Sequence, residues 1–204
     1  MINDLPHIPV TFPEKEIFLR LEGNLSKTRL LPEEKSSFLL TAKKAFSLCH
    51  PAGRWGILPV NEISETGISL ADGSFIPGGD FARRCEKITH LWFGAVTIGN
   101  ILADRAKKLE SISMQAIYDA VGSETADAAM ESLVILAKSA LLHRNLVPDP
   151  RRWSPGYGDM SLETQKFFFS ALKLAELDMV LSDNFYMTPE KSVTAFAGVR
   201  NFQE

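Results

Sequence analysis

The stretch "ISMQAIYDAVGSETADAAMESLVILAKSALLHR", residues 112–144, is the longest helical pattern in the chain and sets the dimensions of the fold. Its alanines, leucines and glutamates favour a helix, and its small residues allow another element to approach closely. Gly122 and Ser123 leave two interpretations open. They end one helix and begin the next, or they lie inside one long helix where small side chains permit close packing.

The segments on either side of this stretch differ in type. Residues 87–99, "KITHLWFGAVTIG", are almost continuously apolar and predict a buried strand that Gly99 ends. Residues 161–177 predict a helix with Ser161 as its N-cap. We expect this helix to bury Phe167, Phe168, Ala171, Leu172, Leu174 and Ala175.

The remaining patterns complete a mixed fold. Helices are predicted over residues 13–22, 31–49, 78–85 and 100–111, an antiparallel meander over 54–75, and two extended pieces around Pro189 within 185–200. No repeat or linker divides the chain. The sequence therefore predicts one α+β domain over residues 1–204, with helices packed around a mostly antiparallel sheet.

Charge and hydropathy exclude several classes of partner. The 204 residues carry a formal net charge of -3, which gives no electrostatic attraction for nucleic acid. No apolar run is long enough to cross a membrane, and the N-terminus lacks the features of a signal peptide. We expect a cytoplasmic protein without a nucleic-acid or membrane partner.

Familiar catalytic and metal-binding motifs do not occur. Cys49 and Cys85 have no nearby ligand-forming residues and are expected to be reduced and buried. The four histidines are scattered without metal-ligand spacing, and residues 73–80 lack the Lys-Ser/Thr of a phosphate-binding loop. The sequence predicts neither a metal site nor a catalytic residue.

The stretch "PRRWSPGYGDMS", residues 150–161, is unusual for a connection between helices. A cation at Arg152, an aromatic ring at Tyr157 and the next helix start lie within one short loop, which suits a small ligand with a carboxylate and a flat ring system. Gly156 and Gly158 permit positive φ, so the loop can be rigid before a ligand arrives. The alternative is a structural loop in which Arg152 forms a salt bridge and Trp153 and Tyr157 cover the core.

Residues 151–159, "RRWSPGYGD", match an Arg-x-x-x-Gly-Tyr pattern. The pattern resembles the activation domain of cobalamin-dependent methionine synthase, and still more closely the small stand-alone proteins related to it. Residues 90–105, 118–133 and 184–199 resemble further segments of that family in the same order. The specific similarity covers about half of the chain, from His90 to Val199.

The resemblance implies an S-adenosylmethionine-binding component that reactivates a corrinoid-dependent methyltransferase, with methionine synthase as the first choice. Cobalamin would be bound by the partner, a corrinoid-binding methyltransferase or methionine synthase subunit, and not by this chain. An electron donor, flavodoxin-like or of another kind, is a further expected partner. The protein would then be one component of a methyltransferase system and not a complete enzyme.

The resemblance also assigns the site. Arg152 would contact the carboxylate of the methionine moiety, while Ser154, Gly156 and Tyr157 would supply backbone contacts and a ring face. Asp127 would lie near the sulfonium, where the family usually has Glu. The chain stops at Glu204, before the C-terminal extension of the methionine synthase domain. These two departures keep an alternative open, a docking module that has lost productive ligand binding; a reactivator for a different corrinoid methyltransferase is a third hypothesis.

Overall fold

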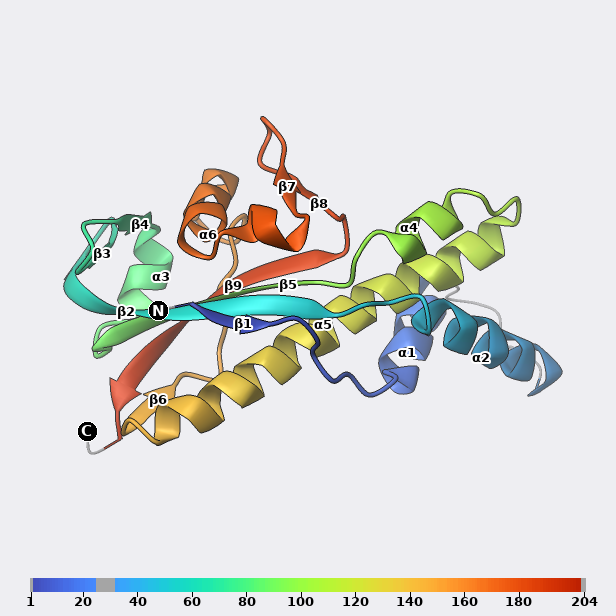
Figure 1. Cartoon of the computed structure of the whole chain (residues 1–204), viewed down its shortest axis with the longest axis horizontal. Helices are drawn as coiled ribbons and strands as arrows, with labels where there is room; N and C mark the ends of the chain where they lie inside the picture. The colour runs from blue at the N-terminus through green and yellow to red at the C-terminus, as the bar shows by residue number, and fades with distance from the viewer. Residues whose placement is uncertain (1, 25–31, 203–204) are drawn as a thin grey trace.

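The centre of the fold is an antiparallel sheet, seen edge-on in Figure 1. The computed structural model describes residues 2–24 and 32–202. The strands lie in the order β4-β3-β2-β5-β9-β6, and β1 also pairs with β2. Their bounds are β1 Asn3–Leu5, β2 Ala52–Ser64, β3 Gly67–Leu70, β4 Phe75–Pro77, β5 His90–Thr97, β6 Leu146–Pro148 and β9 Ser192–Asn201. This arrangement confirms the α+β class, the meander and the apolar strand.

Helix α5, Ile112–Leu142, is one continuous helix of 31 residues that runs across one face of the sheet (Figure 1). Gly122 therefore lies inside a helix, and the interpretation with two helices is wrong. A Cβ atom at Gly122 would lie 2.9 Å from Leu102 Cδ2 and 3.0 Å from Lys191 Cγ. The glycine thus lets α4 and the start of β9 pack against α5.

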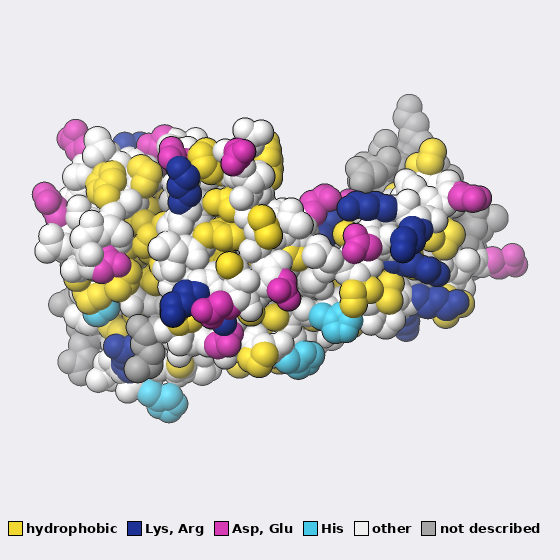
Figure 2. All heavy atoms as spheres, turned by 45° about the horizontal axis from the view of Figure 1, so that its top comes forward, with side chains coloured by type: hydrophobic (Ala, Val, Ile, Leu, Met, Phe, Trp, Pro, Cys, Tyr) yellow, Lys and Arg dark blue, Asp and Glu magenta, His cyan; other side chains and the backbone are white. Residues whose placement is uncertain are grey.

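The N-terminal half of α5 extends past the sheet into a helical arm (Figures 1 and 2). There it packs against α1, Glu14–Asn24, α2, Pro32–Phe46, and α4, Ile101–Ala106. This arm has an apolar core of its own, which includes Ile17, Ala45 and Val121. Helices α1 and α2 agree with the predicted ones apart from shifts at their ends, whereas α4 ends at Ala106, about half as long as the predicted helix over residues 100–111.

Strands β5 and β9 serve two cores because successive side chains point to opposite faces of the sheet. Leu91 and Phe93 of β5 lie in the core on the face opposite α5, whereas Trp92 lies in the core against α5. In β9, Phe196 packs into the first core and Ala195 into the second. The apolar continuity of β5 follows from this burial on both faces.

The face opposite α5 carries short elements: α3, Gly79–Arg84, the 3-10 helices η1, Leu162–Thr164, and η2, Leu174–Leu177, α6, Gln165–Ala171, and a small hairpin of β7, Val180–Leu181, and β8, Met187–Thr188. The single helix predicted over residues 161–177 is therefore wrong. The chain turns at Lys173, which has a φ of 52°, and Ala175 is exposed instead of buried.

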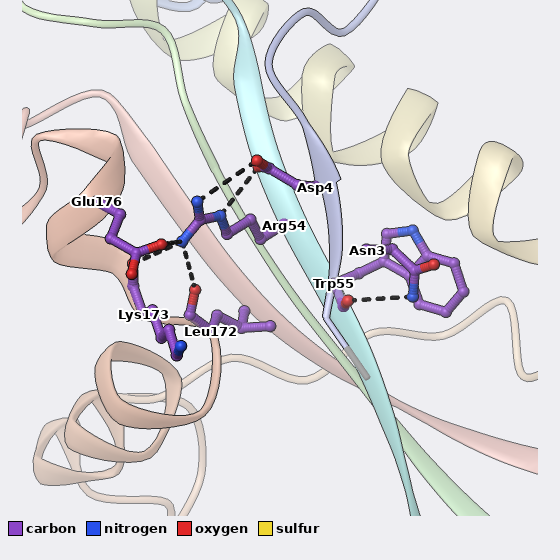
Figure 3. A network of polar contacts seen from close by, with 7 residues as sticks. All are labelled: Asn3, Asp4, Arg54, Trp55, Leu172, Lys173 and Glu176. Carbon is purple, nitrogen blue, oxygen red and sulfur yellow. Dashed lines mark hydrogen bonds and ion pairs between the residues drawn. The ribbon is translucent and has the colours of Figure 1, made fainter.

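The break at Lys173 is stabilised by Arg54, which is only 8% exposed (Figure 3). Its Nη1 donates to the carbonyl oxygens of Leu172 at 3.2 Å and Lys173 at 2.8 Å, and to Glu176 Oε2 at 2.8 Å. Its Nε donates to Asp4 Oδ1 at 2.9 Å. The Leu172 carbonyl lies at the end of α6, where carbonyls lack helical partners, and the Lys173 carbonyl also accepts from the backbone N–H of Glu176 at 3.0 Å. The arginine thus joins β1, β2 and η2.

Both cysteines are free thiols, but they differ in burial. Cys85 is buried, as expected, whereas Cys49 is only half-buried, so that part of the expectation is wrong. Desolvation raises the pKa of Cys49 to about 11 and that of Cys85 to about 12, and both therefore remain protonated near neutral pH.

Candidate functional site

The loop of residues 150–161 is held by hydrogen bonds at both ends. Trp153 exchanges two backbone hydrogen bonds with Phe196 of β9, at 2.9 and 2.8 Å. At the other end, Asp159 Oδ2 accepts a 2.7 Å hydrogen bond from the backbone N–H of Gly79 at the start of α3. The loop is therefore fixed to the sheet and to α3.

The turn between these anchors requires its glycines. Gly156 has a φ of 90° and Gly158 a φ of 60°, which confirms the predicted positive values. The backbone N–H of Gly156 donates to Met160 O at 2.8 Å, and that of Tyr157 donates to Ser154 O at 3.2 Å. Both N–H groups are thus used inside the turn.

A cleft of about 550 Å³ lies beside this loop. We define the cleft by its lining residues: Asp127, Met130, Arg152, Trp153, Ser154, Pro155, Tyr157, Gly158, Gln165, Met187, Ser192, Val193, Thr194 and Ala195. Its walls come from α5, the loop, the start of α6, β8 and the first half of β9. Four of the five predicted site residues, Asp127, Arg152, Ser154 and Tyr157, line it, and Gly156 does not.

Arg152 lines the cleft, and its guanidinium has no partner within residues 2–24 and 32–202. Among the described residues, no hydrogen bond or ion pair forms with its guanidinium, so the salt bridge of the structural alternative is not found. Tyr157 is 68% exposed and does not cover the core either. Trp153 does pack inward, stacked on Phe81 with 6.1 Å between ring centroids. The loop thus combines one structural aromatic residue with one free cation and one free ring.

Asp127 supplies the opposite charge on α5. Partial desolvation and the neighbouring carboxylate of Glu124 raise the pKa of Asp127, while Arg20 and Arg152 act to lower it. Arg152 and Asp127 form no direct ion pair, although Arg152 influences the carboxyl electrostatically. The cleft therefore has a free cation on one wall and a carboxylate on another, which suits a ligand carrying both charges.

The first half of β9 forms a further wall, and no described strand pairs with the edge of β9 that lies away from β5 there. Strand β6 pairs with β9 only at residues 199–201, and Trp153 pairs at Phe196. Because backbone groups alternate along an antiparallel strand, the N–H and C=O of Thr194 point to the same edge as those of Phe196, toward the cleft. The Thr194 hydroxyl donates to Gln165 Oε1 at 2.8 Å and orients that amide.

Sequence reasoning did not assign Thr194 and Gln165 to the site. The family resemblance covered residues 184–199, which include Thr194 but not Gln165, and it gave Thr194 no role. The only sequence signal for this pair is that Thr194 lies in an apolar strand, two residues before Phe196. Which edge of that strand is open depends on where β6 ends, and this is a property of the fold.

Two other features bear on the class of protein. Within residues 2–24 and 32–202, no three His, Cys, Asp or Glu side chains are grouped so as to hold a metal ion. In the same part of the chain, every helix is too short or too polar to cross a membrane. The features that describe the protein are its antiparallel α+β fold and the charged cleft at the open edge of β9.

Comparison with known proteins identifies this fold. A crystal structure of the MetH reactivation domain bound to AdoHcy superposes with a TM-score of 0.67 at 16% sequence identity, covering 97% of this chain and 78% of that one. No family model matches the sequence, and no curated protein matches it. The chain therefore has the fold of the MetH reactivation domain.

Proposed function

We propose that this protein binds S-adenosylmethionine in the cleft and acts as a reactivation component for a corrinoid-dependent methyltransferase, with methionine synthase as the first choice. The observation that carries the proposal is the unpaired Arg152 facing a cleft that also contains Asp127, in a chain with the reactivation-domain fold. The solved relative holds AdoHcy, the product that remains when S-adenosylmethionine gives up its methyl group.

The charges of the cleft match those of S-adenosylmethionine. Arg152 offers the planar fork of donors that binds a carboxylate, and no protein carboxylate among the described residues occupies it. Asp127 offers a negative charge to the ammonium or the sulfonium. The open edge at Thr194 offers a backbone donor and acceptor, and the exposed ring of Tyr157 offers a flat apolar surface.

These groups indicate which step this chain performs and which steps its partners perform. Bound S-adenosylmethionine would supply an activated methyl group for the reduced cobalt of the partner. The carbon–sulfur bond would break with its electron pair staying on sulfur, so AdoHcy would remain in the cleft. This chain binds and orients the donor, while cobalamin and the electron source belong to the partners. We propose that the whole chain, 1–204, acts as one activation-domain-like unit in the cytoplasm.

Calorimetric titration of the isolated protein with S-adenosylmethionine and AdoHcy tests the proposal. Arg152→Gln should weaken both ligands at least about tenfold, because a charge-assisted hydrogen bond is lost. Arg151→Gln is the matched control, since Arg151 is bound to Asp149 and does not line the cleft. An Arg152→Gln protein that binds as tightly as the wild type contradicts the assignment.

Absence of saturable heat in the wild type would favour the docking module. Asp127 favours that alternative, because its side chain is shorter than the Glu expected from the resemblance. The titration would then be repeated with a corrinoid protein present, and binding that depends on the partner would place part of the site in the complex.

A further inference from the structure

A second cavity, of about 230 Å³, lies next to Trp153 and is separate from most of the cleft. We call it the arginine pocket; Phe81, Cys85, Ile88, Trp153 and Gly198 form its apolar walls, and Arg84, Asp149, Arg151 and Arg152 form its polar ones. Only Arg152 and Trp153 also line the cleft. Apart from these two residues, the pocket has its own walls and its own charges.

The three arginines of the pocket are not equivalent. Arg151 is neutralised by Asp149, to which its Nε and Nη2 donate at 3.1 Å each. Arg84 and Arg152 have no carboxylate partner among the described residues. Two of the three positive charges are thus uncompensated, although the chain as a whole is acidic.

Arg84 is held in a position that leaves its donors free. Its guanidinium carbon lies 5.1 Å from the centroid of the Trp153 ring, within the range of a cation–π contact. Such a contact uses the face of the guanidinium, and the five N–H donors lie in its plane. Trp153 thus orients the cation without consuming any of its hydrogen-bonding capacity.

The walls behind these cations are apolar and uncharged. Phe81, Cys85 and Ile88 all belong to the core between the sheet and α3. Desolvation and Asp149 raise the pKa of the Cys85 thiol to about 12, so this wall stays neutral and unreactive near neutral pH. A ligand that fills the pocket needs an apolar body and an anionic end.

We propose that the arginine pocket binds a small aromatic carboxylate, with its ring against Phe81 and Ile88 and its carboxylate between Arg84 and Arg152. The cavity is below the usual range of drug-sized sites, which begins at about 300 Å³, and so limits the ligand to one or two fused rings. A planar carboxylate matches the fork of an arginine better than a single point charge does. This proposal does not depend on the proposed function.

Titration with naphthalene-2-carboxylate, compared with the neutral naphthalene-2-carboxamide, tests the charge requirement. The carboxylate should bind saturably, and the carboxamide should bind about tenfold more weakly, because it cannot accept charge-assisted hydrogen bonds from two arginines. Equal affinity for the two compounds, or no saturation by the carboxylate up to about 10 mM, overturns the proposal.

Two adjacent arginines on α3 give a matched pair of variants. Arg84→Gln should weaken the carboxylate about tenfold, whereas Arg83→Gln should leave it unchanged, because Arg83 pairs with Asp80 outside the pocket. Both side chains are exposed, so both variants are expected to fold. Unchanged affinity in Arg84→Gln overturns the proposal.

Amide chemical shifts locate the bound compound. Naphthalene-2-carboxylate should move the resonances of Cys85 and Gly198, which line only the arginine pocket. Shifts confined to Thr194 and Asp127 would place the compound in the cleft and would overturn the proposal. Arg84→Gln should bind S-adenosylmethionine as the wild type does, since Arg84 does not line the cleft. This result would distinguish the arginine pocket from the cleft.

Discussion

Two arginines of this protein show opposite uses of the same side chain. Arg54 is buried beneath η2 and donates to two carbonyls and two carboxylates, so it joins segments distant in sequence (Figure 3). Arg152 lies on a rigid loop and has no partner among the described residues. A buried guanidinium with all of its partners stabilises the fold, whereas a free one on a fixed loop is available for a ligand.

The largest effect is expected at the structural arginine. Arg54→Met keeps a long apolar stem but leaves the carbonyls of Leu172 and Lys173 without their charged donor. The free energy of unfolding, measured by urea denaturation, should fall by about 2–3 kcal/mol. Arg20→Met is the control, because the pair between Arg20 and Glu124 is more exposed and should contribute less than about 1 kcal/mol. Equal losses in the two variants would remove the distinction.

The contacts of Arg54 also explain why the sequence patterns failed to predict one part of the fold. Residues 161–177 have the composition of one helix, yet the helix ends where an arginine 118 residues earlier in the chain captures the carbonyl of Leu172. Strands β1 and β6 have three residues each and are too short to show a period of two. In contrast, α5 and β5 are long, and their patterns predicted a helix and a strand there, although the α5 pattern left open whether its residues form one helix or two.

The site divides in the same way. The loop and Asp127 were assigned to one site through the family resemblance of their segments, and the structure brings both to one cleft. The wall at Thr194 was missed because it depends on an unpaired strand edge. The hydrogen bonds that the turn makes through the N–H groups of Gly156 and Tyr157 depend on its three-dimensional form and have no signal in the sequence.

The rigidity of the loop is tested by Gly158→Ala. The new Cβ would lie 3.0 Å from Trp153 Cζ2 and 3.2 Å from Asp80 Oδ2, in addition to the strain of a positive φ. We expect a loss of about 2 kcal/mol in the free energy of unfolding. Gly73→Ala is matched, since Gly73 has a φ of 87° and a Cβ there meets no atom within 4 Å; its expected loss is about 1 kcal/mol. If Gly158→Ala costs no more than Gly73→Ala, close packing of the loop on Trp153 is not a source of its rigidity.

The carboxylate opposite Arg152 predicts a pH dependence of binding. The pKa of Asp127 is raised by burial and by Glu124, so its negative charge is lost at a higher pH than that of an ordinary aspartate, and S-adenosylmethionine should bind more weakly as the pH falls. Asp127→Asn should weaken binding about threefold at pH 7, the effect of a partly exposed charge pair, and should flatten the pH profile.

The charge of Asp127 should strengthen ligand binding but lower the stability of the unliganded protein. A carboxyl whose pKa is higher in the folded than in the unfolded protein binds protons more tightly when folded, so its contribution to stability decreases as the pH rises through these two values. Asp127→Asn should therefore raise the Tm slightly at pH 7 while it weakens the ligand. A variant that loses stability at pH 7 would show that Asp127 is a structural residue.

The smallest expected effect on stability is that of replacing Arg152, and it distinguishes this residue most clearly from Arg54. Arg152→Gln removes a cation that has no bonded partner among the described residues, so the free energy of unfolding should change by less than about 0.5 kcal/mol. Arg151→Gln, which breaks an exposed pair with Asp149, should change it by less than about 1 kcal/mol. Urea denaturation of both variants without ligand gives the comparison. A loss above about 1 kcal/mol in Arg152→Gln would mean that the loop needs this cation to fold, and any loss of ligand binding in the same variant would then reflect a disturbed loop and not a missing contact.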